Sequence, residues 1–126
     1  MLRAREDGAT MPTREGALSR AAEFFDGGGF RGLLAELVAV PSTSQEAGRE
    51  ADLERYLHGA VRPWLERMGF AVAVHLNPAE GFGPILSAER MEDPSRPTVL
   101  LYGHGDTVRG LEDQWTPGLD PWTLTE

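Results

Sequence analysis

Cysteine and lysine are both absent from this chain of 126 residues, whose 12 basic residues are all arginine. The absence of cysteine excludes disulfide bonds, thiolate zinc sites and a cysteine nucleophile. The absence of lysine excludes a Schiff-base amine and the lysine of a phosphate-binding P-loop. Several classes of catalytic site are therefore ruled out for these residues before any motif is considered.

Positive charge is also scarce, because the formal net charge is -8 and the arginines are scattered among carboxylates. Such a surface does not suit nucleic acid, whose phosphates need clustered positive charge. No apolar run approaches the roughly 20 residues that cross a bilayer, and residues 1–12 lack the apolar segment of a signal peptide. We expect an acidic cytoplasmic protein that binds neither nucleic acid nor membrane, with a flexible N-terminus at residues 1–12 and one domain over residues 13–126.

Apolar residues at helical spacing predict three helices in the first half of the chain. Two short helices are expected over residues 13–26 and 30–40. The third and longest is expected to begin at a capping box, in which Thr43 and Glu46 each accept the other's backbone N–H. Pro63 lies inside this helix and removes one backbone donor there. Because the apolar stripe continues in phase beyond it, we expect a kink rather than two separate helices.

Three strands are expected to follow the helices. Residues 70–76 alternate between larger and smaller side chains, as in a half-covered strand, and residues 85–89 form a second candidate. Val99–Tyr102 is apolar on both faces, which is typical of a strand buried in a parallel sheet. The fold class predicted from this order is α/β, with helices followed by a partial, mostly parallel sheet.

A histidine and a carboxylate follow directly after the third strand, in the sequence Gly103-His104-Gly105-Asp106. The two glycines allow the backbone to turn sharply, and ligands of open α/β sheets bind beyond the carboxyl ends of the strands. A neutral imidazole binds zinc well, and a ligating histidine usually donates its other ring N–H to a carboxylate. The pattern favours His104 as a metal ligand, with Asp106 either orienting its ring or approaching a metal-bound water.

The motif at residues 98–108, together with residues 37–42 and the helix end at residues 68–70, resembles the start of the zinc-dependent aminoacylase and carboxypeptidase family. This family includes acetylornithine deacetylase, succinyl-diaminopimelate desuccinylase and related dipeptidases. The resemblance implies a zinc-exopeptidase-like catalytic domain in which His104 binds metal and Asp106 supports catalysis. It also implies a two-metal Zn²⁺ site, in which cobalt or manganese could replace zinc, and a small peptide or N-acyl amino acid as the substrate. The complete family members form homodimers through a smaller lid domain.

The chain departs from the family pattern by ending before the other site residues. The bridging aspartate, the paired glutamates, the last histidine and the lid domain of the family have no counterpart here, so we expect the remaining ligands and the catalytic base beyond Glu126. A two-metal site needs side chains from several strand ends. We therefore interpret the chain as the N-terminal part of a metallohydrolase that cleaves an amide bond, inactive on its own.

Two alternatives remain open at this stage. In the first, the chain belongs to a serine α/β-hydrolase and His104-Gly105 is its oxyanion segment, although no serine here lies in the Gly-x-Ser-x-Gly elbow of that class. In the second, it is a non-catalytic truncated product whose exposed strand edge makes it aggregate or bind a partner. His58 and His75 are expected at the surface, and Trp115 and Trp122 either in packing or at the rim of a cleft.

Overall fold

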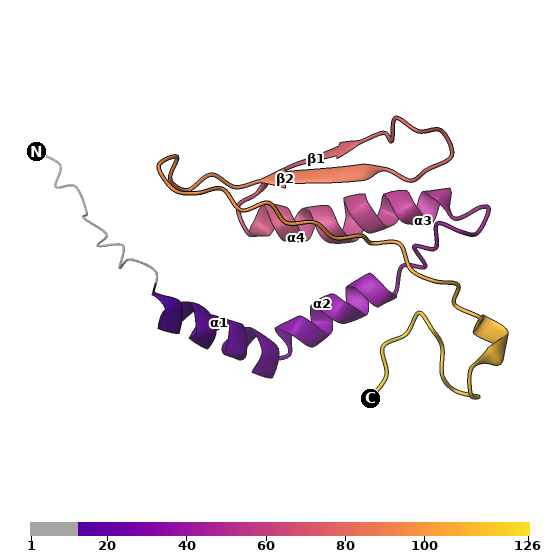
Figure 1. Cartoon of the computed structure of the whole chain (residues 1–126). Coiled ribbons are helices and arrows are strands. Elements are labelled where there is room, and N and C mark those ends of the chain that lie inside the picture. Colours follow the sequence, from indigo (N-terminus) through magenta and orange to yellow (C-terminus); the bar gives the residue numbers. More distant parts are fainter. Residues whose placement is uncertain (1–12) are drawn as a thin grey trace, which may run out of the picture. The chain divides into compact units, whose positions relative to one another are not determined.

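The protein has a mixed α/β fold in a computed structural model, which describes residues 13–126. The described residues divide into two compact units, one that ends at Leu33 and one over residues 34–126. Figure 1 shows the helices and strands along the chain. The flexible N-terminus predicted at residues 1–12 lies outside the described residues. No helix in the described part is long and apolar enough to span a membrane.

The two short helices have the predicted positions. α1 (Arg14–Asp26) begins where the Thr13 hydroxyl accepts a hydrogen bond from the backbone N–H of Gly16 at 3.0 Å. α2 (Gly29–Val38) starts in the first unit and continues into the second. These helices are confirmed because their signals act within a few residues: glycines follow the last turn of α1, and Pro41 follows closely after α2.

The predicted long helix contains a π-helical turn in place of a sharp kink. It consists of three consecutive segments, α3 (Glu50–Arg55), the π turn η1 (Tyr56–Val61) and α4 (Arg62–Arg67). The backbone N–H of Arg62 bonds to the carbonyl of Leu57, five residues earlier. In an α-helix the ring of Pro63 would press on the carbonyl of Gly59. The wider turn directly before Pro63 relieves this conflict, since π turns open the usual ladder of backbone bonds.

The predicted capping box is wrong, because the helix begins later than Thr43. Arg49 is the residue before α3, and no side chain caps this end. The side chain of Thr43 is fully buried, and its hydroxyl has no hydrogen-bond partner within the described residues. The neighbouring Ser42 and Ser44 bond to another part of the chain, as shown below, so the backbone runs past Thr43 instead of turning into a helix.

The prediction of a mostly parallel sheet is also wrong for the part of the chain that is described. β1 (Ala71–His75) pairs antiparallel with β2 (Ile85–Glu89), with Ala71 opposite Glu89. The connection over residues 76–84 is shorter than the dozen or more residues that a parallel crossover needs. α4 contacts β1 beside this hairpin (Figure 1).

The segment predicted to be a buried central strand is instead exposed. Val99, Leu100, Leu101 and Tyr102 are 77%, 94%, 84% and 92% exposed and belong to no strand. Their apolar character is that of a sheet interior, but residues 13–126 place no second strand beside them. None of the described apolar side chains is fully buried. The buried residues are Ser42, Thr43 and Gly110, so burial in this chain is concentrated around polar loops.

Candidate functional site

The two residues predicted for the site are in direct contact. Nδ1 of His104 lies 3.0 Å from Oδ1 of Asp106 and 3.1 Å from the backbone carbonyl oxygen of the same residue. Both partners are acceptors, so a neutral imidazole carries its proton on Nδ1 in this arrangement. Nε2 makes no hydrogen bond to the described residues. With the His104 side chain 70% exposed, Nε2 is the nitrogen open to a ligand.

The second carboxylate oxygen of Asp106 is occupied by a serine from a distant part of the chain. The Ser44 hydroxyl donates to Oδ2 of Asp106 at 3.0 Å. The carboxylate therefore bridges Ser44 and His104. The order is serine, aspartate, histidine, which differs from a nucleophilic triad, where the histidine stands between the other two and takes the serine proton. Ser44 has no base of that kind beside its hydroxyl among the described residues.

Ser42 makes two further hydrogen bonds between the segment around Ser44 and the loop around Asp106. Its hydroxyl donates to the carbonyl of Gly105 at 2.6 Å. Its own carbonyl accepts the backbone N–H of Thr107 at 3.0 Å. Ser42 is only 2% exposed, so these bonds are shielded from water and hold the loop around Asp106 in place.

Gly105 is required for close packing rather than for a turn. Neither Gly103 nor Gly105 has a positive φ, so the predicted sharp glycine turn is not formed. A Cβ atom at Gly105 would lie 2.1 Å from Cε1 of Tyr56, whereas one at Gly103 would meet nothing within 4 Å. Tyr56 is the first residue of η1. Burial raises the pKa of its phenol.

Both tryptophans after the motif have their indole N–H groups bonded within the loop. Trp115 donates to the carbonyl of Gly110 at 2.7 Å, and Trp122 donates to Oε1 of Glu112 at 2.8 Å. Arg49 lies 3.5 Å from the same Glu112 oxygen. The hydrogen bond from Trp122 is the largest cause of a lowered pKa at Glu112. Trp115 is 45% exposed and lines a hollow together with Arg109 and Gly110. The contacts therefore fit both roles considered for these tryptophans, packing and the rim of a cleft.

Trp122→Phe is expected to raise the pKa of Glu112 toward its ordinary range, because the lost indole N–H stabilises only the ionised carboxylate. A carboxyl whose pKa is lowered by folding stabilises the folded loop above its unfolded pKa, and this contribution is lost as the pH falls through the folded pKa. The measurement is a ¹³C NMR titration of the Glu112 carboxyl carbon. Trp115→Phe is the matched control and should leave this pKa unchanged. Equal pKa values in the two variants would contradict the assignment.

The two other histidines lie at the surface, as predicted, and each has a different kind of partner. Nε2 of His58 is 3.3 Å from Oε2 of Glu54 within one helical turn. Nε2 of His75 is 2.8 Å from the Ser87 hydroxyl across the hairpin. Neither joins His104. The described residues contain no group of three or more histidine, aspartate or glutamate side chains that could together hold a metal ion.

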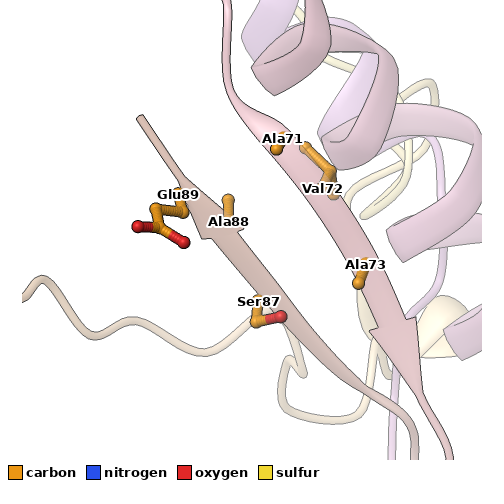
Figure 2. Close-up of a pocket in the computed structure, with 6 residues that line it drawn as sticks. All are labelled: Ala71, Val72, Ala73, Ser87, Ala88 and Glu89. Carbon is orange, nitrogen blue, oxygen red and sulfur yellow. The ribbon is translucent and has the colours of Figure 1, made fainter. Parts of the chain in front are cut away.

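A hollow of about 340 Å³ lies on the hairpin, away from the candidate site in the sequence and with no histidine in its lining. Figure 2 shows its lining residues, which are mostly small: Ala71, Val72, Ala73, Ser87, Ala88 and Glu89. Such a surface supplies no pair of groups for acid–base or metal chemistry. The candidate site therefore remains at His104 and Asp106.

Two curated proteins are similar to the chain. Acetylornithine deacetylase of Proteus mirabilis is 33% identical over 95 residues, which are 75% of this chain and 23% of that protein. Beta-Ala-His dipeptidase of Mus musculus is 50% identical over 44 residues, which are 34% of this chain and 8% of that protein. Both relatives are hydrolases. The chain thus spans about a quarter of the length of the first relative and less of the second.

No family model matches the chain, and no solved structure matches it significantly. The two curated relatives have names that fall within the group of hydrolases to which the sequence pattern pointed. They support a relationship of this chain to hydrolases of the peptidase type.

Proposed function

We propose that the chain is the N-terminal part of a metal-dependent hydrolase that cleaves an amide bond in a small peptide or an N-acyl amino acid. The observation that carries the proposal is the state of the His104 ring, in which Nδ1 is held by Asp106 and Nε2 is open. This is the arrangement in which histidines bind divalent metal ions. The names of the two relatives support the reaction, because a deacetylase and a dipeptidase both hydrolyse an amide bond.

Zinc fits the donor that His104 presents, and cobalt or manganese could use the same nitrogen. One imidazole does not hold zinc tightly, and the described residues form no group of three or more potential ligands at this place. We therefore place the other ligands and the catalytic base outside this chain. A bound metal ion would supply a water molecule that is acidic enough to attack a carbonyl near neutral pH.

The chain's own residues do three things in this proposal. His104 offers one ligand nitrogen from an exposed position that a substrate can reach. Asp106 accepts a hydrogen bond from the Nδ1–H group of His104. This bond fixes the tautomer and makes Nε2 a stronger ligand for a metal ion. The packing of Gly105 against Tyr56 sets the position of the backbone between these two side chains. Asp106 thus acts through His104 and is a positioning residue in this scheme.

The test uses Co²⁺ as a paramagnetic probe of the three histidines in the ¹⁵N-labelled chain. We expect the imidazole signals of His104 to broaden at the lowest Co²⁺ concentration, because its carboxylate contact is the shorter, 3.0 Å against 3.3 Å at His58, and its side chain is the more exposed, 70% against 47%. The ring of His75 is paired with a serine hydroxyl and has no carboxylate beside it. Asp106→Asn should raise the Co²⁺ concentration needed at His104 by about tenfold or more. Glu54→Gln, which alters the carboxylate beside His58, is the matched control and should leave His104 unchanged.

Equal broadening of all three histidines would contradict the metal site. Hydrolysis of a dipeptide or an N-acetyl amino acid by the isolated chain with Zn²⁺ would contradict the placement of the other ligands outside it. No observation favours the serine-hydrolase alternative, because the Ser44 hydroxyl bonds to a carboxylate and the Ser42 hydroxyl to a backbone carbonyl, and neither is bonded to an imidazole.

A further inference from the structure

We propose that Ser44 is a positioning residue that holds the Asp106 carboxylate in the one orientation that keeps Nδ1 of His104 protonated and Nε2 open. The metal-binding part of this inference rests on the proposed function above. The part that concerns the tautomer of His104 rests on the hydrogen bonds alone. Nothing in the spacing of the sequence indicates the contact, because Ser44 and Asp106 are 62 residues apart.

The first step concerns the freedom of the carboxylate. The last torsion of an aspartate side chain is broad and roughly two-fold, so the carboxylate group of an exposed aspartate rotates easily. The Asp106 side chain is 45% exposed, and its own backbone does not fix that torsion. Oδ1 contacts His104 and Oδ2 accepts from Ser44. With the two oxygens engaged by different partners, both hydrogen bonds fix the plane of the carboxylate, apart from the equivalent rotation that exchanges the two oxygens.

The second step concerns the tautomer. A neutral, exposed imidazole in water exchanges its proton between two nitrogens, and the hydrogen bond made by one nitrogen selects the tautomer. Nδ1 of His104 has two acceptors, the carboxylate oxygen and the carbonyl oxygen of Asp106. A hydrogen bond to the charged acceptor is the stronger of the two. Loss of Ser44 should therefore weaken the selection without abolishing it.

The third step concerns what holds Ser44 itself. Two residues earlier, Ser42 is bonded to Gly105 and Thr107, and Thr43 between them is fully buried. The best-buried side chains of the described residues thus lie directly before Ser44. A side chain that follows such an anchor keeps its position better than one on a free loop, because local order follows burial and backbone bonding. The anchored segment delivers the Ser44 hydroxyl to Asp106.

The serine also has a buried neighbour that makes no such contact. Thr43 carries a hydroxyl like those of Ser42 and Ser44, yet that hydroxyl has no partner within the described residues. Burial of an unpaired hydroxyl is unfavourable. This unpaired hydroxyl lies between Ser42 and Ser44, whose own hydroxyl groups bond to Gly105 and Asp106. Residues 42–44 and 105–107 form a joint between two distant parts of the chain, and hydrogen bonds to Gly105, Asp106 and Thr107 hold it together.

The experiment compares Ser44→Ala with Ser44→Thr and with Ser87→Ala in the ¹⁵N-labelled chain. Threonine keeps the hydroxyl, and Ser87 is the matched control because its hydroxyl lies 2.8 Å from another histidine, His75. The first readout is the tautomer ratio of His104 from its imidazole ¹⁵N shifts at a pH where the ring is neutral. The second readout is the Co²⁺ concentration that broadens the His104 signals. The third is hydrogen exchange of the Thr107 N–H, which reports on the joint.

We expect Ser44→Ala to move His104 toward the Nε2–H tautomer and to raise the Co²⁺ concentration needed by less than the roughly tenfold expected for Asp106→Asn, because the carboxylate itself remains, with Thr107 exchange unchanged. Ser44→Thr should behave like the parent chain, and Ser87→Ala should change only His75. An unchanged tautomer in Ser44→Ala would overturn the proposal. So would a change that is accompanied by faster Thr107 exchange, since the role of Ser44 would then be structural. A tautomer shift in Ser44→Ala, in a chain whose His104 shows no preference for Co²⁺, would support the positioning role and contradict the proposed metal site.

Discussion

Gly105→Ala is expected to displace the segment around Asp106 from Tyr56. An added Cβ would lie 2.1 Å from one carbon of the tyrosine ring and 2.8 Å from the next. Both distances are well inside ordinary contact, so the ring or the loop must move. Forcing extra atoms into a packed contact typically costs about 1–3 kcal/mol. The backbone here is not in the left-handed region, which leaves the steric conflict as the only source of the effect.

Hydrogen exchange of the Thr107 N–H measures this displacement, because that N–H is bonded to the carbonyl of Ser42. A loss of about 2 kcal/mol corresponds to a roughly 30-fold faster exchange. Gly103→Ala is the matched control, since a Cβ at that position meets nothing within 4 Å. The double variant Tyr56→Ala with Gly105→Ala should recover much of the protection. Unchanged exchange in Gly105→Ala would show that the two residues are not packed as described.

The second large effect is expected on self-association. Leu100 and Leu101 are 94% and 84% exposed in a segment that belongs to no strand and has no neighbouring strand within the described residues. Uncovered apolar segments of this kind pair with other chains. Replacing both residues by glutamate should raise the concentration at which the chain associates by about tenfold or more, because each buried leucine contributes about 1.5–3 kcal/mol.

Light scattering over a concentration series measures this change. Leu76→Glu provides the comparison, because Leu76 is also a leucine and is 88% exposed, but it lies in the hairpin connection outside the apolar run. We expect that variant to associate like the parent chain. A parent chain that stays monomeric throughout the series would contradict the expectation and indicate that these residues are covered in solution.

The elements that the sequence predicted correctly are those set by local signals. The positions of α1, α2, β1 and β2 follow from caps, glycines and side-chain periodicity within a few residues. The direction of the β1–β2 pair is also set locally, and the expected parallel sheet was wrong because the connection over residues 76–84 is too short for a parallel crossover. What a local signal does not set is whether a segment is covered by others. The apolar run at residues 99–102 shows the same limit, because its composition indicates a buried strand whereas burial itself depends on neighbouring strands.

The candidate site was predicted only in part, and for the same reason. The contact of His104 with Asp106 is local and follows from their spacing of two residues. Ser42 and Ser44 reach the site from more than 60 residues away, so no spacing rule could find them. Gly105 was singled out as a residue for a turn, while the structure shows that its lack of a side chain makes room for Tyr56.

The π turn at Tyr56–Val61 gives one helix two differently directed halves. An extra residue within a turn rotates everything after it by about a third of a turn, roughly 100°, relative to a regular α-helix. Tyr56, at the start of the π turn, reaches the backbone beside His104, whereas α4 after it contacts β1. Removal of a single residue between Arg55 and Pro63 would restore the regular pitch of the helix. The helix could then no longer place Tyr56 against Gly105 and α4 against β1 at the same time.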